Sequence, residues 1–227
     1  MSFDPLATIA HHADALLDAA AGNLQAPVEH CPGWTVADLV RHIRSVHWFW
    51  ATVVEERRQE PFDERPSFEG ESLLDSARAQ AERLVAVLRA ADPATPVWTW
   101  SPQRDVAFVL RHQVQEAAVH HFDAALAAGL PWSMDAAAAA DAVDEMLTFS
   151  LPGEGDLGGT LTLRADDIGT SWTIGPGPTP GSLAWSREPG PAAVRATAAE
   201  LLLWLYERTE LDTSSVPEDV LARFAEL

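Results

Sequence analysis

The sequence predicts an α+β protein in which an up-down helical bundle precedes a small α/β domain. Apolar residues recur at helical spacing through about the first 150 of the 227 residues. The stretches GTLTLRA and TSWTIG, which come later, alternate between apolar and polar residues in the manner of half-buried strands. Between the two regions lies the glycine-rich stretch PGEGDLGG. We therefore predict a bundle over 1–150 and an α/β domain over 151–227.

Five helices are expected in the first domain. The first starts near Leu6 and stops at Gly22-Asn23. Thr35 is a good N-cap for the second, because Asp38 three residues later completes a capping box. The second helix should continue to about Arg58, before a loop rich in Pro and Glu at roughly 59–70. The other three helices are expected over about 73–91, 105–128 and 134–149.

The second domain is expected to hold two or three short strands and a helix. Two strands are predicted at GTLTLRA and TSWTIG, and SLAW is a candidate third strand. A final apolar helix is expected over AAVRATAAELLLWLYER, and PEDVLARFAEL should add a terminal helical turn or two. No internal repeat is visible.

Charge and composition exclude several classes of function. The net charge is −19, from 34 acidic against 15 basic residues, so a phosphate backbone or an anionic membrane would be repelled. The single cysteine, Cys31, rules out a disulfide framework within the chain. The N-terminal segment lacks the features of a signal peptide, and no apolar run is long enough to span a bilayer. We expect a cytoplasmic protein, a monomer or homodimer, whose partners are small molecules.

The fourth predicted helix carries a polar stripe. His112, Glu116, His120 and Asp123 are spaced so that they lie on one face of that helix. A glutamate and a histidine four residues apart can supply two ligands to one metal ion. The same spacing also occurs on solvated helix faces, so by itself it leaves both interpretations open.

The second predicted helix offers a third ligand. His42 lies on a stripe that is otherwise apolar, and a histidine that points inward needs a hydrogen-bond partner or a metal. His47 lies about 140° further round the helix, so we do not expect it to join the same site. Two histidines and one glutamate on separate helices of one bundle favour a metal site over separate core hydrogen bonds.

The segment GWTVADLVRHIRSVH, followed downstream by QEAAVHHFDAALAAG, resembles the mycothiol-dependent maleylpyruvate isomerase family of the DinB-like helical-bundle superfamily. The resemblance implies that His42, Glu116 and His120 bind zinc or another divalent metal. It also implies mycothiol as co-substrate. Arg208, near the end of LLLWLYER, stands where family members are thought to place an arginine near the substrate, although the glycines that flank it in relatives are absent here.

Two neutral imidazoles and one carboxylate would leave zinc an open position, which is typical of a catalytic site. The resemblance implies that this position holds the sulfur of mycothiol as a thiolate, for isomerisation or S-transfer on a small, anionic substrate. In an isomerase, thiolate addition to an enoate permits rotation about the new single bond, and elimination restores the alkene. Arg208 would hold the substrate carboxylate, with the active site between the two domains. Two alternatives stay open, namely a metal hydrolase that uses zinc-bound water and a catalytically silent binding bundle.

Other polar residues have weaker claims to a role. Asp123 either orients the ring of His120 through its second nitrogen or is an exposed residue of the last turn. His12 is expected to make a cap or core hydrogen bond, and His121 is expected at the surface. His112 is a candidate wall of the site. We do not expect catalysis by Cys31, because only His30 could lower the pKa of its thiol.

Overall fold

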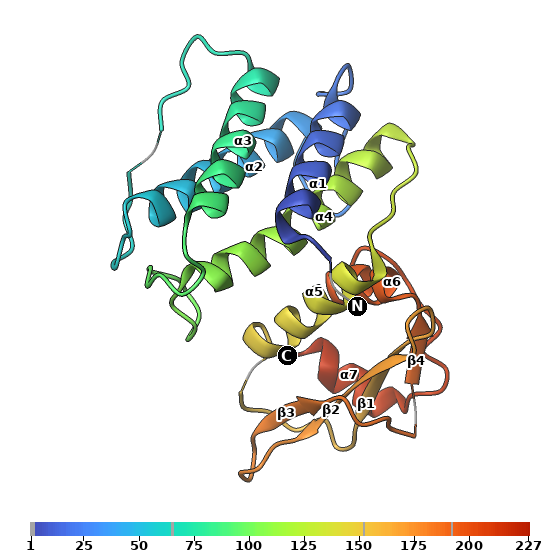
Figure 1. Cartoon of the computed structure of the whole chain (residues 1–227). Coiled ribbons are helices and arrows are strands. Elements are labelled where there is room, and N and C mark those ends of the chain that lie inside the picture. The colour runs from blue at the N-terminus through green and yellow to red at the C-terminus, as the bar shows by residue number, and fades with distance from the viewer. Residues whose placement is uncertain (1–2, 65, 152, 192) are drawn as a thin grey trace. The chain divides into compact units, whose positions relative to one another are not determined.

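A computed structural model describes residues 3–64, 66–151, 153–191 and 193–227. Residues 65, 152 and 192, which belong to the predicted loops and to the start of the predicted final helix, lie outside the described residues. The chain forms two compact units, one that ends at Ser133 and one that begins at Met134. Figure 1 labels the elements, which are α1 (Pro5–Ala20), α2 (Val36–Glu55), α3 (Leu73–Ala90), α4 (Val106–Ala128), α5 (Ala136–Phe149), β1 (Leu161–Ala165), β2 (Thr170–Pro176), β3 (Leu183–Ser186), β4 (Ala193–Ala196), α6 (Ala198–Leu205) and α7 (Glu218–Ala225).

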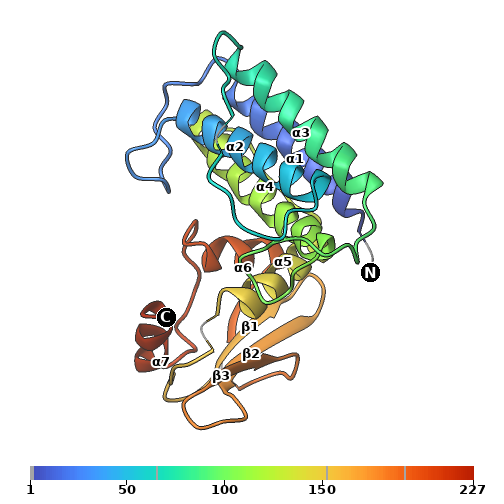
Figure 2. The ribbon, with the colours of Figure 1, turned by 90° about the vertical axis from the view of Figure 1, so that its left-hand side faces the viewer.

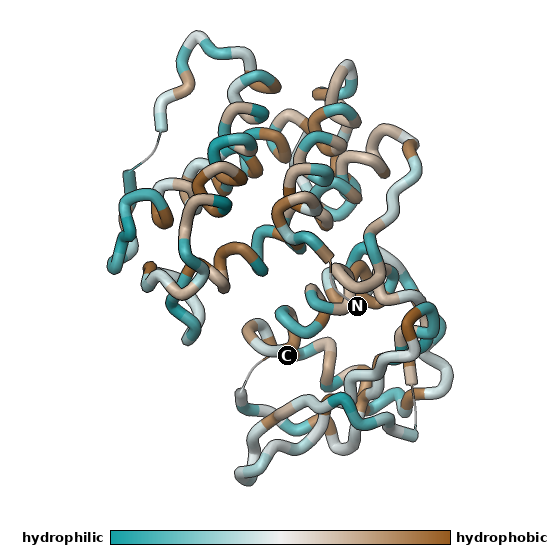
Figure 3. Tube along the Cα trace, in the orientation of Figure 1, coloured by the Kyte–Doolittle hydropathy of each residue, from teal (hydrophilic) through white to brown (hydrophobic). Residues whose placement is uncertain are grey.

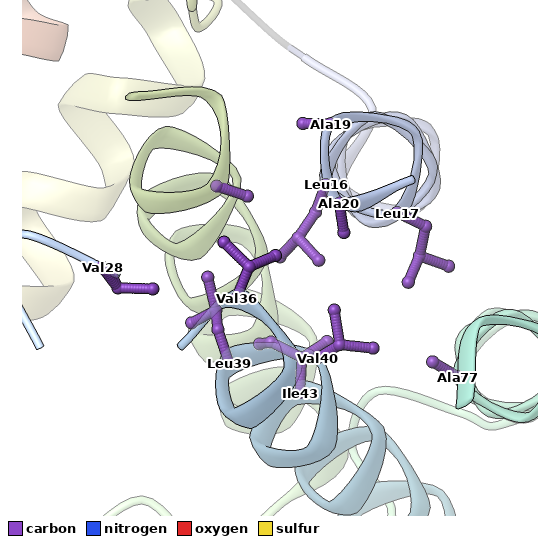
Figure 4. Packing of buried hydrophobic residues seen from close by; sticks show 11 residues of the cluster. Leu16, Leu17, Ala19, Ala20, Val28, Val36, Leu39, Val40, Ile43 and Ala77 are labelled. Carbon is purple, nitrogen blue, oxygen red and sulfur yellow. The ribbon is translucent and has the colours of Figure 1, made fainter. Parts of the chain in front are cut away.

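The first unit is a bundle of the helices α1 to α4. α1 packs mainly against α3 and α4, α2 packs mainly against the same two helices, and α1 and α2 also meet. Figure 2 shows the bundle from a second side. Hydrophobic and hydrophilic residues alternate along these helices in Figure 3, as the sequence periodicity predicts. Part of the core appears in Figure 4, where aliphatic side chains of α1 and α2 meet, among them Leu16, Leu39 and Ile43.

Side-chain caps fix where the helices of the bundle begin. The hydroxyl of Thr35 accepts a hydrogen bond from the backbone N–H of Asp38, and the carboxylate of Asp38 accepts one from the backbone N–H of Thr35 at 3.0 Å. This confirms the predicted capping box, which sets the rotation of α2 and thereby the direction of His42. At the C-terminal end of α4, Gly129 adopts φ 66°. This left-handed conformation terminates a helix, and glycine adopts it at little energetic cost.

The second unit contains a four-stranded sheet in the order β3-β2-β1-β4. β1 pairs with β2 antiparallel and with β4 parallel, and β2 pairs with β3 antiparallel. α6 packs on β1, β4 and α5. The ring of Phe224 in α7 stacks on that of Trp204 in α6, with 5.8 Å between the centroids. A helical bundle followed by a small α/β unit is the predicted fold class, which is therefore confirmed.

Helix α5 marks a difference from the predicted boundary at residue 150. Contacts divide the chain after Ser133, so α5 belongs with the sheet. The indole N–H of Trp172 in β2 donates to the carboxylate of Asp144 in α5 at 2.6 Å, and Arg187 binds the same carboxylate. A charge-assisted hydrogen bond from a fully buried indole holds α5 against the sheet. The hydrophobic periodicity of α5 does not predict this contact.

The predicted final helix over 192–208 is wrong in its first part. Ala193–Ala196 is strand β4, and α6 begins only at Ala198 after Thr197. Thr197 and Glu200 form a capping box, and this sequence pattern marks where α6 begins. The second helix also ends at Glu55, earlier than the predicted Arg58. Among the described residues, no helix is long and apolar enough to cross a membrane.

Candidate metal centre

His42, Glu116 and His120 come together in the bundle. Nε2 of His42 lies 3.0 Å from Oε1 of Glu116, and Nε2 of His120 lies 3.6 Å from the same oxygen. One ligand atom from each residue lies within 4.8 Å of those of the other two. Ligands of tetrahedral zinc at bond lengths near 2.0–2.1 Å are separated by roughly 3.3 Å. The donor set and its spacing therefore fit a divalent ion.

Asp123 is buried and orients the ring of His120. Only 1% of Asp123 is exposed, and its Oδ2 lies 2.9 Å from Nδ1 of His120. A carboxylate accepts, so Nδ1 of His120 carries the proton and Nε2 keeps the lone pair that a metal needs. Of the two interpretations of Asp123 left open by the sequence, the structure shows the contact with His120.

Glu116 is an anion in this environment. Burial by itself would raise the pKa of Glu116, but the hydrogen bond from His42 and the charges of His120 and His112 outweigh it and lower the pKa to about 2. Since the carboxylate is ionised, the imidazole of His42 must donate its Nε2 proton to Oε1. A metal that binds Nε2 of His42 must therefore displace this proton.

A second ligand set shares His120. Ligand atoms of Cys31, His120 and Asp123 also lie within 4.8 Å of one another. In this set Sγ of Cys31 is 3.9 Å from Oδ2 of Asp123, and that oxygen is the acceptor for Nδ1 of His120. A metal there would have to break the hydrogen bond that orients His120, whereas the set with Glu116 leaves it intact. We therefore favour the set of His42, Glu116 and His120.

With this geometry described, comparison with known proteins identifies the family. The family model of the mycothiol maleylpyruvate isomerase N-terminal domain matches residues 6–125, which is more than half of the chain. The chain belongs to this family. The predicted family is thereby confirmed, and membership supports an isomerase enzyme. A comparison with curated proteins finds no match.

Two solved structures share the fold. One is the crystal structure of the mycothiol-dependent maleylpyruvate isomerase, with a TM-score of 0.60 and 15% sequence identity. The other is a histidine-to-alanine mutant of the mycothiol-dependent maleylpyruvate isomerase, with a TM-score of 0.66 and 14% identity. Each match covers 94% of this chain and 94% of the other chain. The similarity extends through both units, and at this identity it supports the fold alone.

Aromatic rings surround the ligands in this member of the maleylpyruvate isomerase family. The ring centroid of Trp34 lies 5.3 Å from that of His42, which in turn lies 5.0 Å from that of His120. His112, one turn before Glu116, stacks on Phe108 with 5.5 Å between the ring centroids. Trp34 thus limits the rotation of His42. The charge of His112 acts on Glu116, and the place of His112 in the wall of the site stays a prediction.

His47 lies closer to the site than its helical angle suggests. Its side chain is 1% exposed, and neither ring nitrogen has a hydrogen-bond partner among the described residues. Burial lowers the pKa of His47 to about 4, and the charges of Glu116, His42 and His120 act on it. The signal in the sequence is the stripe Ile43, His47, Trp50 and Val54, which is apolar except for His47.

The prediction that His121 is at the surface is wrong. His121 is 8% exposed, and its Nδ1 lies 2.9 Å from Nδ1 of His12 in α1, which is 2% exposed. α4 packs against α1 as well as α2, so residues that face away from the metal ligands are still buried. His12 makes the core hydrogen bond that was predicted for it.

His12 should make the bundle less stable in acid. Burial, followed by the charges of His121 and His11, lowers the pKa of His12 to about 3. An unfolded chain binds this proton near pH 6.5, so the stability present at neutral pH is lost as the pH falls from about 6.5 toward 3. We expect His12 to reduce the free energy of unfolding by about 2 kcal/mol between pH 7 and pH 5.

Urea denaturation of wild-type protein and of His12→Asn, at both pH values and with a chelator present, measures this effect. The asparagine can still hydrogen-bond to His121 but does not titrate, so its stability should depend less on pH. Equal pH dependence in the two proteins would contradict the prediction.

Arg208 belongs to the second unit. Its Nη1 donates to the backbone carbonyl of Tyr206 at 2.7 Å. Glu207, just before it, adopts φ 59°, so the chain turns sharply where α6 ends. The contact of Arg208 with a substrate carboxylate remains a prediction from the family resemblance.

Proposed function

We propose that this mycothiol-dependent isomerase binds one divalent metal ion, zinc, through His42, Glu116 and His120. The observation that carries the proposal is the convergence of three ligand atoms within 4.8 Å from the two helices α2 and α4, although His42 and Glu116 are 74 residues apart in the sequence. The buried Asp123 beside His120 supports it, because histidine ligands of metals commonly donate their second N–H to a carboxylate. Such a set of two histidines and one glutamate leaves a coordination position open.

When bound, a zinc ion with an open position lowers the pKa of a thiol, so that mycothiol reacts as a nucleophile at neutral pH. The chain itself has three tasks. Asp123 keeps the proton of His120 on Nδ1, and Glu116 supplies the negative charge that balances part of the charge of the cation. His42 would have to present the lone pair of Nε2 to the metal, with its proton on Nδ1. Because protons compete with the metal for imidazole and carboxylate ligands, we expect metal uptake to weaken as the pH falls.

The substrate that we propose is a small cis-enoate with a carboxylate, of which maleylpyruvate is the example named by the similar structures. Reversible addition of the thiol to the alkene permits rotation about the bond, and loss of the same thiol restores the alkene. The carbon skeleton of the substrate and the thiol are both unchanged at the end of this cycle. Arg208 is our candidate for binding the substrate carboxylate, by the bidentate contact that arginine makes with such groups. Replacing Arg208 by alanine should therefore raise KM and leave the metal content unchanged.

Cobalt substitution tests the proposal directly. Cobalt(II)-loaded protein titrated with mycothiol should develop a sulfur-to-cobalt charge-transfer band that saturates at about one thiol per metal. The band should appear only after the thiol is added, because the favoured ligand set contains no sulfur. Maleylpyruvate should then be isomerised only when both metal and mycothiol are present.

Cys31→Ser is the matched control for this experiment. A sulfur-to-cobalt band before addition of mycothiol, lost in Cys31→Ser, would show that the ligands are Cys31, His120 and Asp123 instead. Hydrolysis without mycothiol, and no band on adding it, would favour water as the nucleophile.

A further inference from the structure

The bundle buries an imidazole, that of His47, which the proposed function does not use. Neither ring nitrogen of His47 has a hydrogen-bond partner within the part of the chain that the structure describes, although only 1% of the residue is exposed. A buried polar group without a partner costs roughly 1–3 kcal/mol. An apolar side chain at this position of the stripe would avoid that cost. We therefore expect the buried imidazole of His47 to have a hydrogen-bond partner in another state of the protein.

The packing of α2 on α4 places His47 beside the metal centre. His42 of α2 contacts Glu116 of α4, and Trp50 of α2 contacts His112 of α4 with 6.2 Å between the ring centroids. The two helices are therefore antiparallel here, and His47, between His42 and Trp50, lies level with the turn from His112 to Glu116. The charges of Glu116, His42 and His120 act on its ring, which agrees with this position.

Metal binding would change the hydrogen-bond donors that are available to Glu116. In the metal-free chain, Oε1 of Glu116 accepts the Nε2 proton of His42. To bind a metal, Nε2 of His42 would need its lone pair free, so its proton would have to move away and Glu116 would lose this donor on becoming a ligand. Carboxylate ligands are commonly held by a hydrogen bond from outside the ligand set. His47 is neutral at pH 7, with one N–H group to donate.

We propose that His47 is a positioning residue of the metal centre, which donates a hydrogen bond to the carboxylate of Glu116 when the metal is bound. The inference rests on the proposed function, because it assigns to Glu116 the role of ligand. It also gives the buried N–H of His47 a partner and fixes the carboxylate in the direction of the metal. His47 touches neither substrate nor thiol in this role.

Zinc affinity, measured by competition with a chromophoric chelator, tests the proposal in wild-type protein, His47→Leu and His47→Gln. Leucine fills similar space without a donor, and glutamine keeps an N–H group near the position of Nε2. We expect His47→Leu to bind zinc about 10–100-fold more weakly than wild type. His47→Gln should stay within about threefold of wild type, because the donor is restored. The urea midpoint of metal-free His47→Leu should be no lower than that of wild type.

Three results would overturn the role of His47 while leaving the proposed function intact. Zinc affinity in His47→Leu could equal that of wild type. It could vanish as completely as in His42→Ala, which would make His47 a ligand. It could also fall equally in the leucine and glutamine variants, which would assign the loss to packing. Wild-type protein that binds no zinc would instead overturn the proposed function and this inference with it. If His47→Leu does not fold, His47→Phe provides the same comparison.

Discussion

Replacing His42 by alanine is expected to lower the zinc affinity by more than about 100-fold, beyond the range typical of residues outside the ligand set. The bound metal should fall from about one ion per chain to near zero, and isomerase activity should fall with it. The reason is the loss of one of three ligands from a site whose other two, Glu116 and His120, lie on a single helix. Metal analysis after dialysis, together with turnover of maleylpyruvate, measures both effects.

The fold should survive this change, because the side chain of His42 is 34% exposed and Glu116 can be solvated when its partner is removed. Helical content by circular dichroism provides the control. Glu116→Gln should lose metal in the same way while keeping the size of the side chain. Full metal content in both variants would show that the ion binds elsewhere.

Asp123→Asn is expected to give the second largest effect, a loss of about 10–100-fold in zinc affinity. The amide can donate as well as accept, so it no longer holds the proton of His120 on Nδ1 and the lone pair on Nε2. The shape of the side chain is preserved, and so the loss would report the tautomer of His120 rather than packing. Chelator competition measures the affinity, and activity should recover in part at saturating zinc.

Cys31→Ser is the matched control, because Cys31 also contacts Oδ2 of Asp123, at 3.9 Å. Its zinc affinity should stay within about threefold of wild type. An effect in Cys31→Ser as large as that in Asp123→Asn would instead support the second ligand set.

The sequence was sufficient to predict the parts that depend on local chemistry. The capping box at Thr35 and Asp38, the amphipathic periodicity of the bundle and the i, i+4 spacing of Glu116 and His120 are properties of single helices, and the structure shows each of them. The pairing of His42 with Glu116 joins residues far apart in sequence. Their expected inward positions favoured a shared site, and the family resemblance named both as ligands.

Errors arose where one helix has several neighbours. His121 was expected at the surface because it faces away from Glu116, yet α1 covers that face. The strand at Ala193–Ala196 was predicted as part of a helix because its pairing partner, β1, lies far upstream in the sequence. In each case the missing information was the identity of a tertiary neighbour, which periodicity does not contain.

The contact between His42 and Glu116 joins points 74 residues apart in the sequence. An ion bound there would act as a cross-link between α2 and α4 of the folded bundle, and it would stabilise the native state because the unfolded chain does not hold the three ligands together. The chain has only one cysteine and so has no internal disulfide to do this. Loading with metal should thus protect the bundle from proteases and from heat by an amount that grows with the free metal concentration. Resistance to unfolding and capacity for catalysis would then be limited by the same supply of metal.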